Sequence, residues 1–312
     1  KHKYRLEQIQ QDAKARLPHV EPPKRKDEPF RRTDLSYLFA ASLETPSSTL
    51  SAALGERLAP LMEQQRLVFV DGVYRADLSD TSALPPGVVA ASYADAHLPP
   101  SAEADIARAL LALPEAELEF PRKALGCLPF ATLNQAALSD AACVYLPAGV
   151  ELTAPLHLVS ISTGSAGDSS ALAVSHPNAI VWLEPNSKLS LVHEYAGEGD
   201  YFTNAVTRCH VGAGASLAHA YLQEQSPSAV HVDSVVATLG EDAEYDAQFM
   251  QWGGRISRVN LDLEFASPGG HADIDGLALG SGSQLLDLHS TLKHNAPRCT
   301  SNQRQRNAAS GR

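Results

Sequence analysis

Hydrophobic and polar positions between Ile180 and Leu292 follow one pattern that is repeated four times. In each copy, a turn of small residues is followed by a short strand of alternating apolar and polar positions, a polar stretch and a second strand. Leu189, Leu217 and Tyr245, which follow the first three turns, are spaced 28 residues apart, and the fourth copy is shifted by about one residue. A fixed period of about 20–50 residues is typical of stacked repeats, and strands of period two without intervening helices predict a β-solenoid.

Each repeat has a turn, followed by a strand in which every second residue is expected to face the core. The turns are Pro185-Asn186, Gly212-Ala213-Gly214, Gly240-Glu241-Asp242 and Pro268-Gly269-Gly270. The residues at every second position of the strand after each turn (one parity of the strand) are mostly apolar, and we expect them to face the core. Neighbouring coils would stack there about 4.8 Å apart. These positions are Leu189, Leu191 and His193, then Leu217, His219 and Tyr221, then Tyr245, Ala247 and Phe249. The other parity carries Ser190, Val192, Glu194 and Asp246, and we expect it to face outward.

The N-terminal part of the chain has a different pattern, so we assign residues 1–125 to an α+β region and residues 126–312 to the β-solenoid core. Asp71-Gly72 predicts a hairpin, because this dipeptide supplies the positive φ angles that a two-residue turn needs. The hairpin strands are predicted at Leu67–Val70 and Val73–Ala76, and further strands at Val144–Leu146, Val150–Leu152 and Leu156–Ile161. Helices are predicted over Lys1–Leu17, Ser47–Gln65 (capped by Ser47, Ser48 or Thr49) and Ser101–Leu113.

Composition and charge limit the classes of partner. The chain is 44% hydrophobic and 20% charged, which is typical of a globular protein, and its net charge of −11 argues against nonspecific binding to nucleic acid or anionic lipid. No apolar run approaches the roughly 18 residues of a membrane span. The four cysteines, Cys127, Cys143, Cys209 and Cys299, lie far apart, which favours free thiols in a reducing compartment.

Histidines and cysteines are the first candidates for chemistry, but neither His-x-His nor His-Glu-x-x-His occurs, so we predict no metal site. His193 and His219 fall on the inward parity of neighbouring repeats, and we interpret them as core histidines with satisfied hydrogen bonds; a shared polar pocket is the alternative. Cys299 lies near His294 and a basic stretch, where positive charge would favour a thiolate. We favour a structural role for Cys299, and keep His294 and Cys299 as the candidates for cofactor binding.

Several enzyme classes lack support in the sequence. There is no phosphate-binding Gly-x-x-x-x-Gly-Lys-Ser/Thr loop and no Gly-x-Ser-x-Gly nucleophile motif. A polysaccharide lyase built on a β-helix is the alternative function, since such enzymes stack carboxylates on one outer face. Here the carboxylates do not repeat at the same position of the coil, and Asp246 with Asp273 or Asp275 comes nearest.

Three segments resemble the SufB/SufD family. Arg31-Arg32-Thr33-Asp34-Leu35-Ser36 is similar to a segment near the start of SufD proteins, and His176-Pro177-Asn178 and residues 294–301 (HNAPRCTS) resemble the family's core. The resemblance covers roughly residues 15–312, and the short Thr-Asp-Leu-Ser arm favours the SufD branch over SufB.

The resemblance implies a right-handed parallel β-helix and a noncatalytic scaffold subunit of the SUF iron–sulfur cluster assembly machine. Such a subunit pairs with SufB and acts with the ATPase SufC in a SufBCD complex, holds no stably bound cofactor, and meets a transient cluster only in the complex. It implies a bacterial cytoplasm or a plastid stroma. The family's C-terminal Asp-Asp-Val-x-Cys-x-His-Gly stretch and its SufC-binding helices have no counterpart in residues 1–312, so we expect the chain to be truncated before them.

Overall fold

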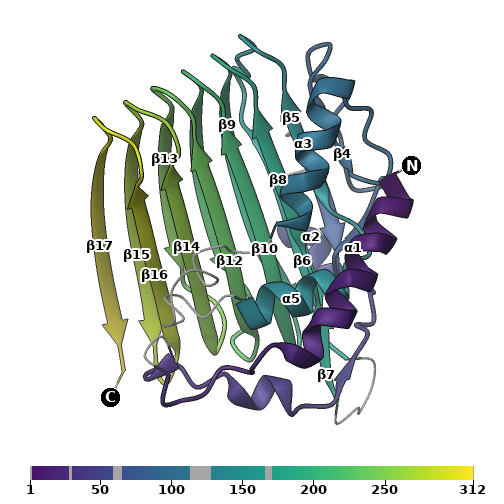
Figure 1. Cartoon of the computed structure of the whole chain (residues 1–312). Helices are drawn as coiled ribbons and strands as arrows, with labels where there is room; N and C mark the ends of the chain where they lie inside the picture. The colour runs from purple at the N-terminus through teal and green to yellow at the C-terminus, as the bar shows by residue number, and fades with distance from the viewer. Residues whose placement is uncertain (1, 28–29, 59–64, 113–127, 166–170, 312) are drawn as a thin grey trace.

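Successive coils of the chain stack on one another and form two β-sheets, which make up most of the molecule (Figure 1). The computed structural model describes residues 2–27, 30–58, 65–112, 128–165 and 171–311. Sheet A contains β4 (Val89–Ser92), β5 (Ala142–Leu146), β8 (Asn178–Leu183), β10 (Tyr201–Val211), β12 (Val230–Leu239), β14 (Ile256–Phe265) and β16 (Leu285–His294), with β1 (Leu43–Glu44) and β7 (Leu172–Ser175) beside this path. Sheet B contains β2 (Arg66–Val70), β3 (Val73–Tyr74), β6 (Leu156–Thr163), β9 (Lys188–Glu198), β11 (Ser216–Glu224), β13 (Glu244–Gln251), β15 (His271–Ser281) and β17 (Thr300–Ser310).

The strands of the repeat alternate between the two sheets, and each pairs in parallel with its equivalent in the next coil. Leu189 lies beside Leu217, and Leu217 beside Tyr245, which confirms the 28-residue period. Tyr245 pairs with Ala272, 27 residues on, which confirms the shift of the fourth copy. The prediction of a parallel β-solenoid is therefore confirmed, with about five turns.

A column of tight turns runs along one edge of the solenoid. One residue in each turn has a positive φ angle: Asn186 (60°), Gly214 (62°), Asp242 (51°), Gly269 (83°) and Arg298 (63°). The backbone N–H of each of the first four donates to a carbonyl in the next turn, at 2.7–3.2 Å. The turns therefore stack as a hydrogen-bonded ladder, and glycine, asparagine and aspartate predominate because they best tolerate this backbone conformation.

The predicted parity of the strands is also confirmed. All nine inward positions named from the sequence are at most 2% exposed. Ser190 and Asp246 on the other parity are exposed, and Val192 and Glu194 are half-buried. The interior of the solenoid, which we call the lumen, is thus closed by side chains from both sheets.

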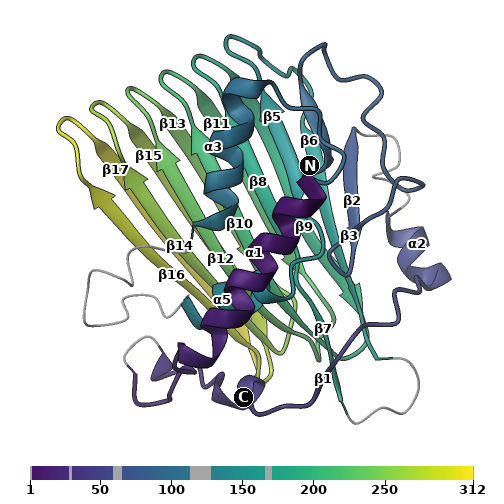
Figure 2. The ribbon, with the colours of Figure 1, turned by 45° about the vertical axis from the view of Figure 1, so that its right-hand side comes forward.

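Helices cover the outer face of sheet A (Figure 1, Figure 2). They are α1 (His2–Arg16), α3 (Pro100–Leu111) and α5 (Leu128–Ala136), whereas α2 (Ala52–Leu58) packs Leu54 against β2 and β6 of sheet B. Leu6 and Ile9 of α1 share a core with Ile106 of α3 and with Cys143 and Ile180 of sheet A. Two 3-10 helices, η1 (Leu17–His19) and η3 (Ser36–Phe39), lie along the N-terminal arm.

Three details differ from the sequence prediction. Helix α2 begins at Ala52, and the Ser51 hydroxyl accepts the Leu54 N–H at 3.1 Å, so the predicted caps at residues 47–49 were wrong. No strand forms at Val150–Leu152, where only an isolated bridge joins Glu151 to Lys188. Helix α5 was not predicted. Residues 59–64 of the predicted second helix lie outside the described residues.

The N-terminal region contributes strands to the solenoid. The predicted hairpin is confirmed, with φ of 52° at Asp71 and 80° at Gly72. Its strand β2 also pairs in parallel with β6, and β4 pairs antiparallel with β5, so each sheet is extended by the preceding region. The predicted boundary between residues 125 and 126 lies outside the described residues. Over the part of the chain that the structure describes, none of the helices combines the length and apolar character needed to cross a membrane.

Candidate functional site

The predicted pair His294 and Cys299 lies in the last described turn. His294 ends β16, is exposed, and has its Nε2 3.1 Å from the Ser301 hydroxyl. The half-buried Cys299 thiol donates to the backbone carbonyls of Ser267 at 3.4 Å and Pro297 at 3.5 Å. The bond from Cys299 to Ser267 joins this turn to the turn before it, and the role of the pair in cofactor binding stays a prediction.

The other cysteines differ in environment. Cys143 and Cys209 are free and buried, and burial raises the pKa of each thiol to about 12. A thiol with so high a pKa stays protonated at neutral pH and is a poor nucleophile. Cys127 lies outside the described residues.

The lumen brings His193 and His219 together. Their ring centroids are 5.9 Å apart and their planes differ by 15°. The Nδ1 of His219 lies 2.9 Å from the Tyr245 hydroxyl, whereas neither ring nitrogen of His193 has a hydrogen-bond partner among the described residues. Both side chains are buried, as expected for core histidines. The expectation of satisfied hydrogen bonds was wrong for His193.

Sequence reasoning missed His231 and Asp233, which enter the same lumen from β12. The hydroxyls of Tyr195 and Tyr221 donate to Asp233 Oδ2 at 2.8 and 3.0 Å, and the Tyr221 oxygen lies 2.6 Å from His231 Nε2. Asp233 Oδ1 has no partner within the described part of the chain. The 28-residue period could not reveal this cluster, because β12 faces β9 and β11 across the lumen and does not pair with them.

Burial in the lumen shifts the pKa values of these groups and so determines which of them are charged. Burial lowers the pKa of His219 to about 4 and that of His231 to about 3. Burial, with a smaller contribution from the two other histidines, puts the pKa of His193 well below its usual value. Burial raises the pKa of Asp233 to about 6, against the opposing hydrogen bonds from Tyr195 and Tyr221. At neutral pH the cluster therefore holds three neutral imidazoles around one carboxylate.

Metal binding finds no support in this geometry. No group of three or more His, Cys, Asp or Glu side chains within the described ranges is arranged to hold a metal ion. The carboxylate and its two phenol donors instead form a hydrogen-bonded network that fixes β9, β11 and β12 relative to one another.

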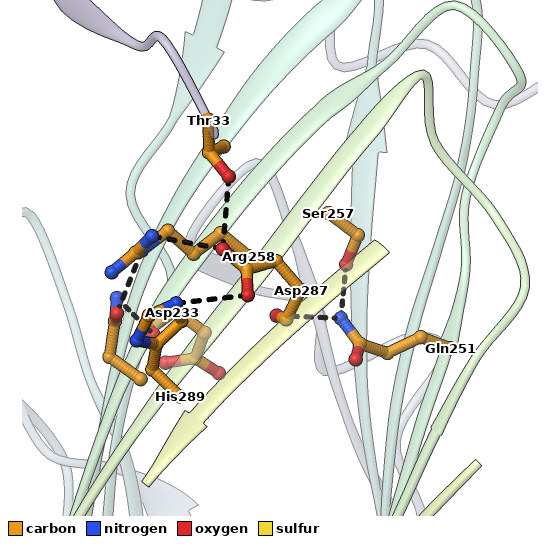
Figure 3. Close-up of polar contacts among 8 residues, drawn as sticks. Thr33, Asp233, Gln251, Ser257, Arg258, Asp287 and His289 are labelled. Atoms are coloured by element: carbon orange, nitrogen blue, oxygen red, sulfur yellow. Dashed lines mark hydrogen bonds and ion pairs between the residues drawn. The ribbon is translucent and has the colours of Figure 1, made fainter. Parts of the chain in front are cut away.

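A second buried cluster fastens the N-terminal arm to sheet A, and Figure 3 shows Thr33, Arg258 and Asp287, which we call the clasp. The Thr33 hydroxyl donates to Asp287 Oδ2 at 3.0 Å, and the fully buried Arg258 guanidinium donates to the same oxygen at 2.9 Å. His289 Nε2 lies 3.1 Å from Asp287 Oδ1. The guanidinium carbon of Arg258 also lies 4.7 Å from the centre of the Phe30 ring.

The clasp explains part of the arm motif. Thr33 and Leu35 are 1% and 0% exposed, so the motif is built into the fold. Burial alone would raise the pKa of Asp287, but His289, Arg258 and Thr33 together lower it, and the carboxylate stays charged beside Arg258. Removing one partner of such a buried ion pair is strongly destabilising.

The His176-Pro177-Asn178 motif also has a structural role. The Asn178 side chain donates to Asn134 Oδ1 of α5 at 2.7 Å, and Asn134 in turn donates to the Pro177 carbonyl at 2.9 Å. Arg208 donates to Asn178 Oδ1 at 3.2 Å. These bonds fasten α5 to the outer face of sheet A.

Two of the outward carboxylates considered for lyase chemistry, Asp273 and Asp275, are engaged in hydrogen bonds. Asp246 and Asp273 are neighbours in the register of β13 and β15. Asp273 accepts from Asn302 at 2.9 Å, and Asp275 pairs with Arg304 at 2.6 Å. Hydrogen bonds from Asn302 and Arg304, respectively, lower the pKa of the two carboxyls. Carboxylates held by neighbouring amide and guanidinium groups in this way are common on a protein surface and give lyase chemistry no specific support.

The fold and its buried clusters define a repeat protein of the parallel β-solenoid class, in which polar side chains fix the coils and the arm. Residues 163–312 match the family model described as SUF system FeS cluster assembly, SufBD core domain. This match over residues 163–312, together with the similarity of the chain to proteins named for the SufBD family and SufD, supports a protein of the SufB/SufD family.

Relatives in bacteria and a plant support this assignment. An iron–sulfur cluster assembly SufBD family protein of Synechocystis is 27% identical over 300 residues, which cover 92% of this chain and 62% of the relative. Protein ABCI7, chloroplastic, of Arabidopsis thaliana is 30% identical over 90% of this chain and 57% of its own length. The iron–sulfur cluster assembly protein SufD of Escherichia coli is 24% identical over 90% and 61%. The chain thus spans about three fifths of the length of these curated relatives.

Proposed function

We propose that this protein is a noncatalytic scaffold subunit of the SUF iron–sulfur cluster assembly system, of the SufD type. The observation that carries the proposal is the match of residues 163–312, which form most of the coils, to the SufBD core domain. The arm motif that resembles SufD supports it further, because Thr33 of that motif is buried in the clasp.

The proposal includes specific partners. The chain pairs with SufB and acts with the ATPase SufC, as the resemblance of its arm motif to SufD implies. It holds no resident cofactor, and an iron–sulfur cluster meets it only transiently within the assembled complex. The compartment is a bacterial cytoplasm or a plastid stroma, in agreement with relatives from bacteria and one named chloroplastic.

The test isolates the protein as it occurs in the cell. A tag is added to the gene at its own locus, and the complexes are purified under reducing, anaerobic conditions. We expect SufB and SufC to copurify in fixed ratio, and deletion of the gene to lower the activity of enzymes that need [4Fe–4S] clusters. Purification of the folded protein without SufB would contradict the proposed pairing, and a strain lacking SufB provides the control.

A separate experiment addresses SufC. The family's SufC-binding helices have no counterpart in residues 1–312, so we expect purified SufC not to co-elute with this chain alone in size-exclusion chromatography. Stable co-elution would mean that the SufC-binding surface lies within the coils or the N-terminal region.

A further inference from the structure

A groove on the outer face of sheet A belongs to neither of the buried clusters. Its volume is about 1200 Å³, and it runs from α3 across β8, β10, β12 and β14 to Lys293 of β16. Figure 1 shows α3 lying along the sheet at one side of these strands. The groove is therefore lined by side chains from several successive coils.

An aromatic column forms one part of the groove. Tyr145, Trp182 and His210 are register neighbours on successive strands, and the rings of Trp182 and His210 stack with centroids 3.9 Å apart and planes 17° apart. The next residue in this column is Thr238, followed by Glu264. Strands are spaced about 4.8 Å apart, so each strand has room for one stacked ring. The short Thr238 side chain therefore leaves space for a further ring beside His210.

An unpartnered buried oxygen lies in the same groove. Asp262 is 4% exposed, and its Oδ2 pairs with Lys293 Nζ at 3.0 Å. Its Oδ1 has no hydrogen-bond partner among the described residues. A buried acceptor without a donor is costly, and in native proteins such groups commonly meet a ligand, an ion or water. The groove thus offers a flat aromatic surface together with one free acceptor.

The charges at the rim narrow the class of ligand. Five carboxylates line the groove (Asp105, Glu184, Glu241, Asp262 and Glu264) against three cations (Arg108, Arg208 and Lys293). Arg108 is paired with Asp105 at 3.1 Å, and Lys293 with Asp262 at 3.0 Å. This surplus of carboxylates disfavours a polyphosphate or another strongly anionic ligand. A neutral planar ring with N–H donors fits both the aromatic column and the free Asp262 oxygen.

We propose that this groove binds a neutral planar heterocycle of the nucleobase or nucleoside type. The ring stacks on His210 above Thr238, and an exocyclic amino group donates to Asp262 Oδ1. Stacking of a base on an aromatic side chain and one hydrogen bond to a carboxylate each change affinity by about tenfold to a hundredfold.

The experiment uses the fluorescence of Trp182. The chain has two tryptophans, so a Trp252→Phe variant leaves Trp182 as the single reporter in the groove. Adenosine is titrated into this variant, and calorimetry of the unaltered chain measures the same binding. We expect saturable quenching, with affinity lowered about tenfold or more in a His210→Ala variant.

A matched pair of substitutions separates ligand binding from folding. Thr238→Phe places a ring in the proposed position and should abolish binding, whereas Ser190→Phe adds the same ring on the exposed face of sheet B and should leave binding unchanged. Thermal melts check that both variants fold. The proposal is overturned if adenosine gives neither quenching nor heat at millimolar concentration, or if a folded Thr238→Phe variant still binds it. Equal or tighter binding of ATP would overturn the assignment to a neutral ligand.

Discussion

His193 lies 5.9 Å from His219 in the lumen, yet only His219 has a hydrogen-bond partner among the described residues. Both imidazoles are fully buried and on the same parity of neighbouring coils. A buried polar group without a partner is destabilising, whereas the same group with one is close to neutral. The two side chains therefore differ in what they contribute to the stability of the coils, because within the described ranges His193 buries two unpartnered nitrogens and His219 only one.

The first prediction compares phenylalanine at these two positions. His193→Phe removes two unpartnered nitrogens and keeps a ring of similar shape, so we expect the free energy of unfolding to stay the same or rise by about 1 kcal/mol. His219→Phe leaves the Tyr245 hydroxyl buried without its partner and should lower that free energy by about 1–3 kcal/mol. Urea denaturation measures both. A larger loss for His193→Phe than for His219→Phe would contradict the geometry.

The second prediction concerns acid. The pKa values of His231 and His219 are lowered to about 3 and 4 from 6.5, so the unfolded chain binds protons that the folded chain cannot. The stability that the folded protein has with these two histidines neutral is therefore complete above pH 6.5, and it is lost progressively as the pH falls toward 4. Asp233, raised to about 6 from 3.8, acts in the opposite direction between these values, but the histidines outnumber it. Each uncompensated histidine lowers the free energy of unfolding by up to about 1.4 kcal/mol per pH unit.

Urea midpoints between pH 6.5 and 4 provide the measurement. His231→Phe should reduce the steepness of this pH dependence by about one proton. Leu217→Val, which destabilises the same core without a titrating group, should leave the steepness unchanged and serves as the control. An unaltered pH dependence in His231→Phe would mean that this imidazole is accessible to protons in the folded state.

The third prediction concerns the clasp. Asp287→Ala removes the carboxylate that pairs with the buried Arg258 guanidinium and should lower the free energy of unfolding by about 3–5 kcal/mol. Thr33→Val removes one hydroxyl donor and should cost about 1 kcal/mol. Limited proteolysis of the arm should accelerate in the same order. Asp273→Ala, which removes a solvent-accessible carboxylate, should change little, and an equal loss in all three variants would argue against the clasp.

The fourth prediction concerns the turn ladder. Gly269 has a φ angle of 83°, and an added Cβ would collide with the Asp242 side chain in the preceding turn. We expect Gly269→Ala to lower the free energy of unfolding by about 1–2 kcal/mol or more. Gly280→Ala is the matched control, because its Cβ would meet Leu286 Cδ1 at an ordinary 3.9 Å and its φ angle is not positive. A thermal melt that is unchanged in Gly269→Ala would contradict the constraint.

The solenoid could be predicted from the sequence because its coils repeat. Each coil buries the same positions at a nearly constant spacing, so Leu189, Leu217 and Tyr245 reveal both the period and the inward face. Helix α5 could not be found in this way. Its Thr132, Asn134 and Gln135 are buried along with its apolar residues, so the segment lacks the one-sided polarity by which a surface helix is recognised.

The sites were less predictable than the fold, because they join residues without a fixed spacing. Thr33 and Asp287 are 254 positions apart in the chain, and nothing local to either residue indicates the other. Whether His193 has a hydrogen-bond partner depends on which side chains cross the lumen from β12. The sequence pattern indicates which face a residue occupies, but the partner across that face is set by the three-dimensional packing.

The turns remain aligned although the coils differ in length. The positive-φ residues from Asn186 to Arg298 follow one another at intervals of 28, 28, 27 and 29, and the ladder passes through all of them. The connection from β13 to β14 is two residues shorter than the one from β11 to β12, and the turn after β14 is one residue longer than the turn after β12. Since each coil touches only the coils before and after it, duplication of a whole coil would recreate the same contacts. The architecture thus allows this protein to change length in evolution by whole coils while its ends keep their own structures.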